Sequence, residues 1–216
     1  MAQGDLIIGR GVRVEVGKTE GAAKTVTAVT LANPGVATST AHGLSTKSVG
    51  YFYNVAGMVN LEGQAVRLGT VATDTFQLED IDTTDYPAFT SGTFIPITAW
   101  STLSKATSIA EGGGEADKLN ATVLLDNIRQ ERNGLLAAET MTIGLLAESL
   151  ASEALQIVRR AARDSDLLVF RVTWNNGDVL VFRGEPSKPG RDVQQGQLGT
   201  GTISVTVRGF TTEGAA

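Results

Sequence analysis

Apolar and polar residues alternate along several stretches of the chain, with the period of two that is typical of half-buried β-strands. One such stretch lies within residues 5–16, and another spans residues 202–208 near the end of the chain. Asn176-Gly177 separates the apolar runs 167–174 and 179–183, and it predicts a tight hairpin because both residues tolerate a positive φ. The pattern therefore predicts mainly antiparallel β-structure.

One stretch has a helical period instead. Between residues 149 and 163 the apolar side chains form a single stripe, which consists of Leu150, Ala154, Ile157, Val158 and Ala161. Ser149 is the expected N-cap, and Glu153 complements the positive end of the helix dipole. The sequence thus predicts one α-helix, packed on the sheet through this stripe.

A long hairpin is predicted from the arms 118–126 and 135–147, with its turn around Asn133-Gly134. Each arm separates an apolar face from a polar one. The apolar face consists of Ala121, Val123, Leu125, Met141, Ile143 and Leu145, and we expect it to be buried. The polar face consists of Asn120, Thr122, Asp126, Thr140 and Thr142, and we expect it to be exposed.

Residues 26–100 are predicted to form a self-contained β module inserted in a larger domain of residues 1–25 and 101–216. The segment consists of short strands separated by Gly, Asn, Asp and Ser turns, without helical periodicity. Residues 101–117 follow it as a polar run around Gly112-Gly113-Gly114. A run of this length predicts a flexible loop.

Composition and charge support a non-enzymatic β protein. The chain has 25 glycines, no cysteine and a net charge of −5. The inserted module alone has six acids and two bases, a balance of −4. There is no basic stripe, which argues against a protein that grips nucleic acid, and no apolar run long enough to span a membrane.

Residues that carry catalysis or bind metals are nearly absent from the chain. His42 is the only histidine, so a zinc site of the usual ligands is not expected, and we interpret His42 as a turn residue. Five residues separate Gly11 from Gly17 where a phosphate-binding P-loop needs four. No Gly-x-Ser-x-Gly elbow is present. We therefore expect neither an enzyme nor a bound cofactor or metal.

The expected fold is an antiparallel β-sandwich or half-barrel with one flanking α-helix, plus the small all-β module. That order of elements, ending in the strand Gly201-Thr-Ile-Ser-Val-Thr-Val, resembles the tail tube (major tail) proteins of long-tailed, siphovirus-type bacteriophages. Within the module, Ala41-His42-Gly43-Leu44-Ser45-Thr46 and Thr75-Phe76-Gln-Leu78 resemble small β modules appended to phage tail proteins.

The resemblance implies a structural virion protein that forms stacked hexameric rings, the tube through which DNA is ejected. It implies assembly in the host cytoplasm, and as partners other copies of the chain, a tape-measure protein and other tail proteins. DNA would pass without specific binding. The module is expected on the outer surface of the tube.

Two groups of site residues follow from the resemblance. The polar hairpin face, with Asn120, Thr122, Asp126, Thr140 and Thr142, is expected to line the lumen. The loop after the module is expected to order when rings stack, through Thr107, Glu111, Gly112, Gly113, Gly114 and Glu115. Two alternatives remain open: another tail component of related fold, such as a tail terminator or distal-tail protein, and a carbohydrate-binding or adhesin-like β protein.

Overall fold

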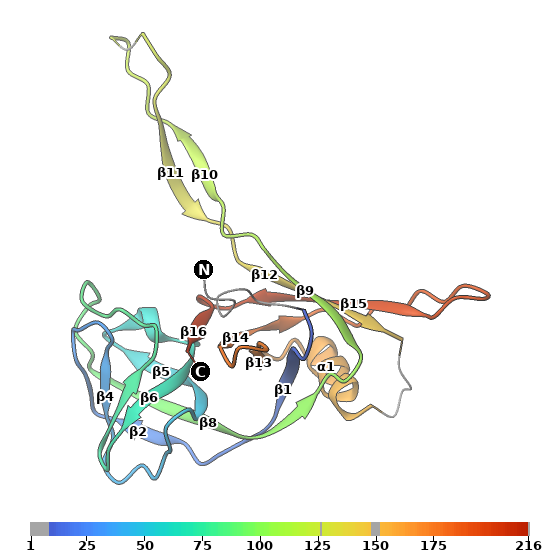
Figure 1. Ribbon diagram of the computed structural model, residues 1–216. Coiled ribbons are helices and arrows are strands. Elements are labelled where there is room, and N and C mark those ends of the chain that lie inside the picture. Colours follow the sequence, from blue (N-terminus) through green and yellow to red (C-terminus); the bar gives the residue numbers. More distant parts are fainter. Residues whose placement is uncertain (1–8, 126, 148–151, 216) are drawn as a thin grey trace, which may run out of the picture.

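The computed structural model describes residues 9–125, 127–147 and 152–215. It is mainly β, with one α-helix, and its large antiparallel sheet curls into a half-barrel (Figure 1). The expected fold class is therefore confirmed. Neighbouring strands follow the order β3-β4-β7-β6-β5-β8-β1-β13-β14-β15-β12-β9, while β2 pairs with β8 and β16 with β14.

Three parts of the chain can be distinguished: two share this sheet, and the third forms a separate two-stranded sheet. The module contains β2 (Lys24–Val26), β3 (Ala28–Val29), β4 (Val36–Thr38), β5 (Val49–Ala56), the 3-10 turn η1 (Val59–Leu61), β6 (Ala65–Val71) and β7 (Thr75–Leu78). The body contains β1 (Arg13–Glu20), β9 (Ala106–Gly112), β12 (Thr140–Leu146), α1 (Glu153–Asp164), β13 (Leu168–Thr173), β14 (Val179–Pro186), β15 (Thr200–Val207) and β16 (Thr212–Gly214). The arm, residues 113–139, contains β10 (Ala116–Asn120) and β11 (Glu131–Leu136).

The helix packs across the body sheet, as its apolar stripe predicts. It begins at Glu153 after Ser152, and Ser165 ends it in the left-handed conformation. Ala154, Leu155 and Val158 are buried against a core that includes Phe170, Phe182 and Ile203, and Ala161 is buried as well. The predicted start, Ser149, and the predicted stripe residue Leu150 lie outside the described residues.

The strand β8 (Ser91–Thr102) connects the module with the body. Its first half pairs with β5 and β2 of the module, and its second half pairs with β1 of the body. The module has its own core around Phe52, Phe76 and Phe94. A further cluster joins Val49, Tyr51 and Ala65 of the module with Val169 and Val181 of the body.

The residues on either side of the C-terminal strand β16 also join the two parts. Gln64, which directly precedes β6, makes two hydrogen bonds with the backbone of Phe210. Its Nε2 donates to the carbonyl at 2.8 Å, and its Oε1 accepts from the N–H at 2.9 Å. The buried Arg67 guanidinium pairs with Glu79 and donates to the carbonyl of Ala215. The module is thus a unit with its own core that packs firmly on the body.

His42 lies in the module and is buried. It is 2% exposed and packs edge-on against Phe76, with the ring centroids 5.3 Å apart. Its Nδ1 accepts a hydrogen bond from the N–H of Leu44. The residue follows a turn at positions 40–41, and its ring is part of the core packing.

The region after the module is not a loop, and this prediction was wrong. Residues 106–112 form β9, which pairs with β12 from Thr140↔Gly112 to Leu145↔Ala106. The glycines 112–114 form the junction between β9 and the arm. Gly113 has φ +81°, and a Cβ there would lie 2.3 Å from the carbonyl oxygen of Ala138, so the close approach of the two chains requires glycine.

The long hairpin exists, but its turn lies elsewhere. Asn133 and Gly134 are inside β11, and the turn falls between β10 and β11, in residues 121–130. The predicted apolar face divides accordingly: Met141, Ile143 and Leu145 are buried, whereas Val123 and Leu125 are 61% and 92% exposed. The first arm of the predicted hairpin therefore projects into solvent and does not pack on the core.

Candidate functional site

A face rich in hydroxyl groups covers the strands at one end of the sheet. In β12, Met141, Ile143 and Leu145 point into the core, so the alternate residues point outward. Thr140 lies opposite Thr206 of β15, and Thr142 lies opposite Ser204. The other neighbour, β9, places Ala110 opposite Thr142 and Ser108 opposite Gly144. The outward residues, which we call the hydroxyl face, are Ser108, Ala110, Thr140, Thr142, Thr202, Ser204 and Thr206.

No lysine or arginine occurs in the three strands that carry the hydroxyl face. The nearest strand residue on β14, Glu185, lies opposite Thr206 and adds a negative charge. The side chains of these three strands offer hydrogen-bonding hydroxyls and methyl groups but no cation for a phosphate. Lys188 and Arg191 lie in the adjoining segment, whose backbone pairs with Thr200, Thr202 and Ser204 of β15. Tight binding of nucleic acid depends mainly on cations that neutralise phosphates, so a polyanion meets little attraction here.

Acidic residues gather where the arm joins the body. Glu111 and Glu139 line a cavity of about 180 Å³ together with glycines 112–114. Partial burial raises the pKa of Glu111, and the negative charges of Glu213 and Glu139 raise it further. The Glu139 carboxylate accepts a hydrogen bond from the N–H of Thr211 at 3.2 Å, which ties the arm base to the C-terminal strand.

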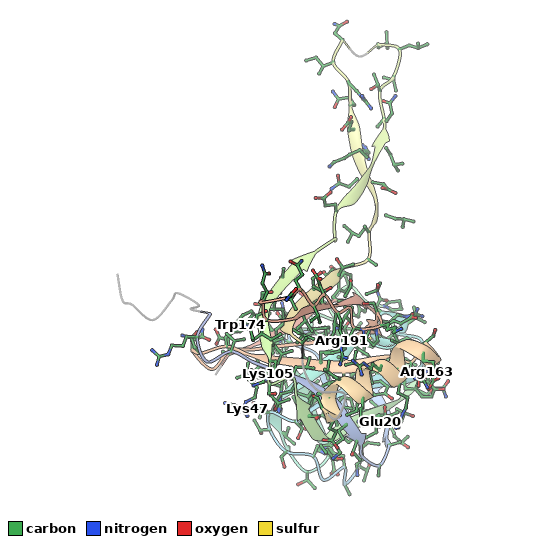
Figure 2. The ribbon with its side chains drawn as sticks, turned by 90° about the vertical axis from the view of Figure 1, so that its right-hand side faces the viewer. Glu20, Lys47, Lys105, Arg163, Trp174 and Arg191 are labelled. Atoms are coloured by element: carbon green, nitrogen blue, oxygen red, sulfur yellow. The ribbon has the colours of Figure 1, made fainter. Side chains whose placement is uncertain are left out.

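The arm projects away from the body as a two-stranded ribbon (Figures 1 and 2). Polar contacts hold its two sides together, such as the 2.6 Å bond from Lys118 to Asn133 and the 2.9 Å bond from the N–H of Gln130 to the hydroxyl of Thr122. Large apolar side chains are exposed along it: Leu119, Val123, Leu124, Leu125, Ile128, Leu135 and Leu136. An isolated two-stranded hairpin is marginally stable in water, and a row of exposed apolar side chains marks an interaction surface.

The strand β9 lies at the end of the strand order and pairs only with β12 among the described residues. Its second edge therefore presents backbone N–H and C=O groups without a strand partner there. Open edges of this kind template pairing with another chain unless they are covered. The hydroxyl face, the arm and this edge together suit a protein that associates with copies of itself.

The residues expected to line a lumen are not all on one surface. Thr140 and Thr142 lie on the hydroxyl face, whereas Asn120 and Thr122 lie on the arm. Asp126 is outside the described residues. The residues of β15 on the same face, Thr202, Ser204 and Thr206, were not expected as site residues. Their alternation with the apolar residues Ile203, Val205 and Val207 is the sequence signal that could have identified them as one exposed face.

The residues expected in a stacking loop lie along β9 and at the arm base, with Thr107 near the start of β9 and the others at or beside the base. Thr107 and Glu111 belong to β9, and Gly112 ends it. Gly113, Gly114 and Glu115 connect β9 with β10. The region is near the acidic cavity, and it is part of an ordered ribbon.

The described residues contain no cluster of three or more His, Cys, Asp or Glu side chains that suits a metal ion. Within the same residues, α1 is too short and too polar to cross a membrane.

A family model described as phage tail tube protein matches residues 56–216. No curated protein matches the chain. Among solved structures, the tail of an empty GTA particle, computed with helical refinement and C6 symmetry, is similar with 11% sequence identity and a TM-score of 0.44. The alignment covers 55% of this chain and 88% of that one.

Proposed function

Because the match spans residues 56–216, the chain belongs to the phage tail tube protein family, and we propose that it forms stacked hexameric rings through which phage DNA is ejected. Its role in the tail is structural, and that family is not an enzyme family. In this proposal the partners are other copies of the chain, a tape-measure protein and other tail proteins. The protein assembles in the host cytoplasm and resides in the virion.

The observation that carries the proposal is the hydroxyl face of β9, β12 and β15. A conduit for DNA needs a wall that does not retain phosphates, and these strands contain no lysine or arginine. We assign Thr140, Thr142, Thr202, Ser204 and Thr206 to the lumen. We do not assign Asn120 and Thr122 to the lumen, because they lie on the arm.

Ring closure follows from the free edge of β9. Pairing of this edge with a neighbouring subunit removes an exposed strand edge, which is otherwise an aggregation hazard. Repetition of the same contact around an axis joins the subunit sheets into a closed wall. The arm, which projects from the body, is then free to contact a second ring.

The module belongs on the outside of this ring. It occupies the end of the strand order opposite β9, so it lies away from the strands that carry the hydroxyl face. Its acidic balance adds negative charge to the outer surface. Excising it exposes Val169, Val179 and Val181, which pack on it.

Electron microscopy of the concentrated protein tests the assembly. The proposal requires long tubes; isolated rings alone indicate a tail terminator or distal-tail protein, and a protein that stays monomeric contradicts the proposal.

A charge substitution tests the lumen assignment. Thr142→Lys with Ser204→Lys adds two cations per subunit to the face, and we expect the resulting tubes to bind fluorescent duplex DNA with an affinity that falls steeply with salt. Thr70→Lys with Thr73→Lys, two exposed positions of the module, is the matched control because it adds the same two cations, and it leaves internal binding unchanged. Equal DNA binding by both variants rejects the lumen assignment.

A further inference from the structure

Two covalent connections join the module to the body on one side of the contact between them, which we call the seam. The strand β8 runs from the module into the body, and residues 21–23 link β1 with β2. The pairing of β1 with β8 is irregular here, with register shifts between Gly17 and Thr19 and between Thr19 and Glu20. Irregularities of this kind bend a strand. The two connections, at the bottom of the view in Figure 1, therefore form a pivot.

The apolar contact across the seam comes from one cluster of side chains. The cluster consists of Val49, Tyr51 and Ala65 of the module, Ile97 of β8, and Val169, Val179 and Val181 of the body. At its edge, the Arg183 guanidinium lies 3.9 Å from the centroid of the Tyr51 ring. Two parts of a chain move relative to one another unless the interface between them is large and apolar. A further contact is needed to fix the angle between module and body.

The C-terminal residues 208–215, which we call the strap, lie across the other side of the seam, above β8 in Figure 1. The strand β16 of the strap pairs with β14 of the body along its whole length. The buried hydroxyl of Thr212 lies 3.2 Å from the carbonyl oxygen of Ala65 in the module and 3.3 Å from that of Val181 in the body. It can donate its one proton to either carbonyl, so it bridges the two parts.

Backbone groups of the strap bond to side chains of the module. Gln64 is 4% exposed, and its amide makes both hydrogen bonds that the backbone of Phe210 can form. The carboxylate of Asp80 accepts a hydrogen bond from the N–H of Glu213 at 2.9 Å. Because an unpaired polar group costs free energy when it is buried, these contacts hold the strap against the module.

The end of the strap lies directly against a buried cation of the module. The Arg67 guanidinium is 4% exposed, pairs with Glu79 and donates to the carbonyl of Ala215. A Cβ on Gly214 would lie 2.4 Å from Nη2 of Arg67. A buried charge must keep its partners, so the guanidinium cannot move aside at little cost. Glycine at position 214 is therefore required for the strap to reach this place.

We propose that the strap fixes the angle between module and body, and that its release lets the module pivot on β8 while both parts stay folded. Each part has a core of its own, and of the described residues in these two cores none belongs to the strap. The inference goes beyond the proposed function and rests on it for one consequence. In the tube, a fixed angle holds every module in the same position on the outer wall.

The strap also contacts the base of the arm. The N–H of Thr211 donates to the carboxylate of Glu139, and Thr211 lines the acidic cavity at that base. One segment of eight residues thus touches the module, the body and the arm base. If the strap is released as a unit, the amide of Thr211 loses protection together with the amides that face the module.

Gly214→Ala tests the strap in the full-length subunit. The added Cβ clashes with the Arg67 guanidinium, so we expect the amides of Phe210, Thr211 and Glu213 to exchange hydrogen at least about tenfold faster. The amides of β4 in the module and of β13 in the body should keep their wild-type protection. Gln64→Met removes the two bonds to Phe210 without a clash, and it should give the same pattern.

Gly190→Ala is the matched control for the alanine variant. A Cβ at this position has its nearest neighbour, Thr202 Oγ1, at an ordinary 3.7 Å, and we expect less than about a twofold change in exchange. Unchanged exchange of the strap amides in both strap variants overturns the proposal. Faster exchange in β4 or β13 also overturns it, because the strap is then part of the folding of a core.

Spin labels measure the angle of the module in the free subunit. The chain has no cysteine, so Thr73→Cys in the module and Arg160→Cys on α1, both at exposed positions, provide one labelled pair. Without the strap contact the module is free to pivot, so we expect Gly214→Ala to make the distribution of distances between the labels at least about twice as wide. An equally narrow distribution in the variant overturns the proposal.

Helical reconstruction of tubes tests the consequence for the outer wall. Wild-type tubes should show density for the wall and for the module, and Gly214→Ala tubes should keep the wall and lose the module through averaging over many angles. Equally sharp module density in the variant overturns the strap while the proposed function stands. Absence of wild-type tubes rejects the proposed function, and the spin labels in the free subunit then decide the inference about the strap.

Discussion

Three adjacent glycines at the arm base allow steric clash to be separated from backbone strain. Gly113 has φ +81°, and an added Cβ would lie 2.3 Å from the carbonyl oxygen of Ala138. Gly114 has φ +73°, but its nearest neighbour would be Glu139 Cγ at an ordinary 3.7 Å. Gly112 has no positive φ, and its nearest neighbour would be Thr140 Oγ1 at 3.3 Å. The three alanine variants therefore differ in one physical factor at a time.

The magnitudes follow from these distances and angles. For Gly114→Ala we expect about 1–2 kcal/mol of destabilisation from the left-handed backbone alone. For Gly113→Ala the carbonyl must also move by about 1 Å, and such overpacking adds roughly 1–3 kcal/mol, for a total of about 2–5 kcal/mol. Gly112→Ala should remain within about 0.5 kcal/mol of the wild type.

Hydrogen exchange of the β9 and β12 amides measures this local stability. Because about 1.4 kcal/mol corresponds to a tenfold change in an equilibrium constant, Gly113→Ala should speed exchange there about 30-fold or more. Gly114→Ala should give an intermediate change, and Gly112→Ala almost none. Equal protection in the Gly113 and Gly112 variants refutes the idea that the glycines fix the junction between β9 and the arm.

Two further predictions concern the interior of the protein. Burial and a hydrogen bond to Glu20 raise the pKa of Tyr51 to about 12, so the folded state holds this proton more tightly than the unfolded state does. The free energy of unfolding should therefore fall by about 2–3 kcal/mol between pH 10 and pH 12. In urea titrations, Tyr51→Phe should flatten this dependence of the unfolding free energy on pH, and an unchanged dependence counts against the assignment. Glu15 is 6% exposed and accepts two hydrogen bonds from Arg171. Because Glu15→Gln leaves a partly buried guanidinium without its anion, it should lower the free energy of unfolding in urea by about 3 kcal/mol. A decrease of less than about 1 kcal/mol contradicts this.

The register of the long hairpin shows how tertiary contacts overrule a local turn signal. Asn133-Gly134 favours a turn by itself. In the structure Ile109 lies opposite Ile143, and farther along the ribbon Ala116 lies opposite Leu136. Burial of Ile143 in the body core sets the first pairing, and the same register then places the turn midway, in residues 121–130. If the two strands paired around Asn133-Gly134 instead, the register would shift and the buried face of β12 would face solvent.

The strand β9 was missed for a related reason. Its sequence, Ala-Thr-Ser-Ile-Ala-Glu-Gly, has little apolar alternation because it lies at the edge of the sheet and is largely exposed. Strand propensity reflects fit to neighbouring side chains more than an intrinsic backbone preference. The partner that makes β9 a strand is β12, about 30 residues later in the chain.

The sequence by itself determined the features whose signal is local: the helix, the closing strand, the hairpin at Asn176-Gly177 and the lack of clustered cations in the strands that carry the hydroxyl face. Alternation and glycine content, which are properties of short windows, also indicated a mainly β protein, and the order of the elements resembled that of the tail tube family. Only the tertiary structure decided that Thr142 faces outward beside Ser204, and that the arm projects from the body with large apolar side chains exposed. Pairing between distant strands depends on which faces are buried together, and burial is a property of the whole folded chain.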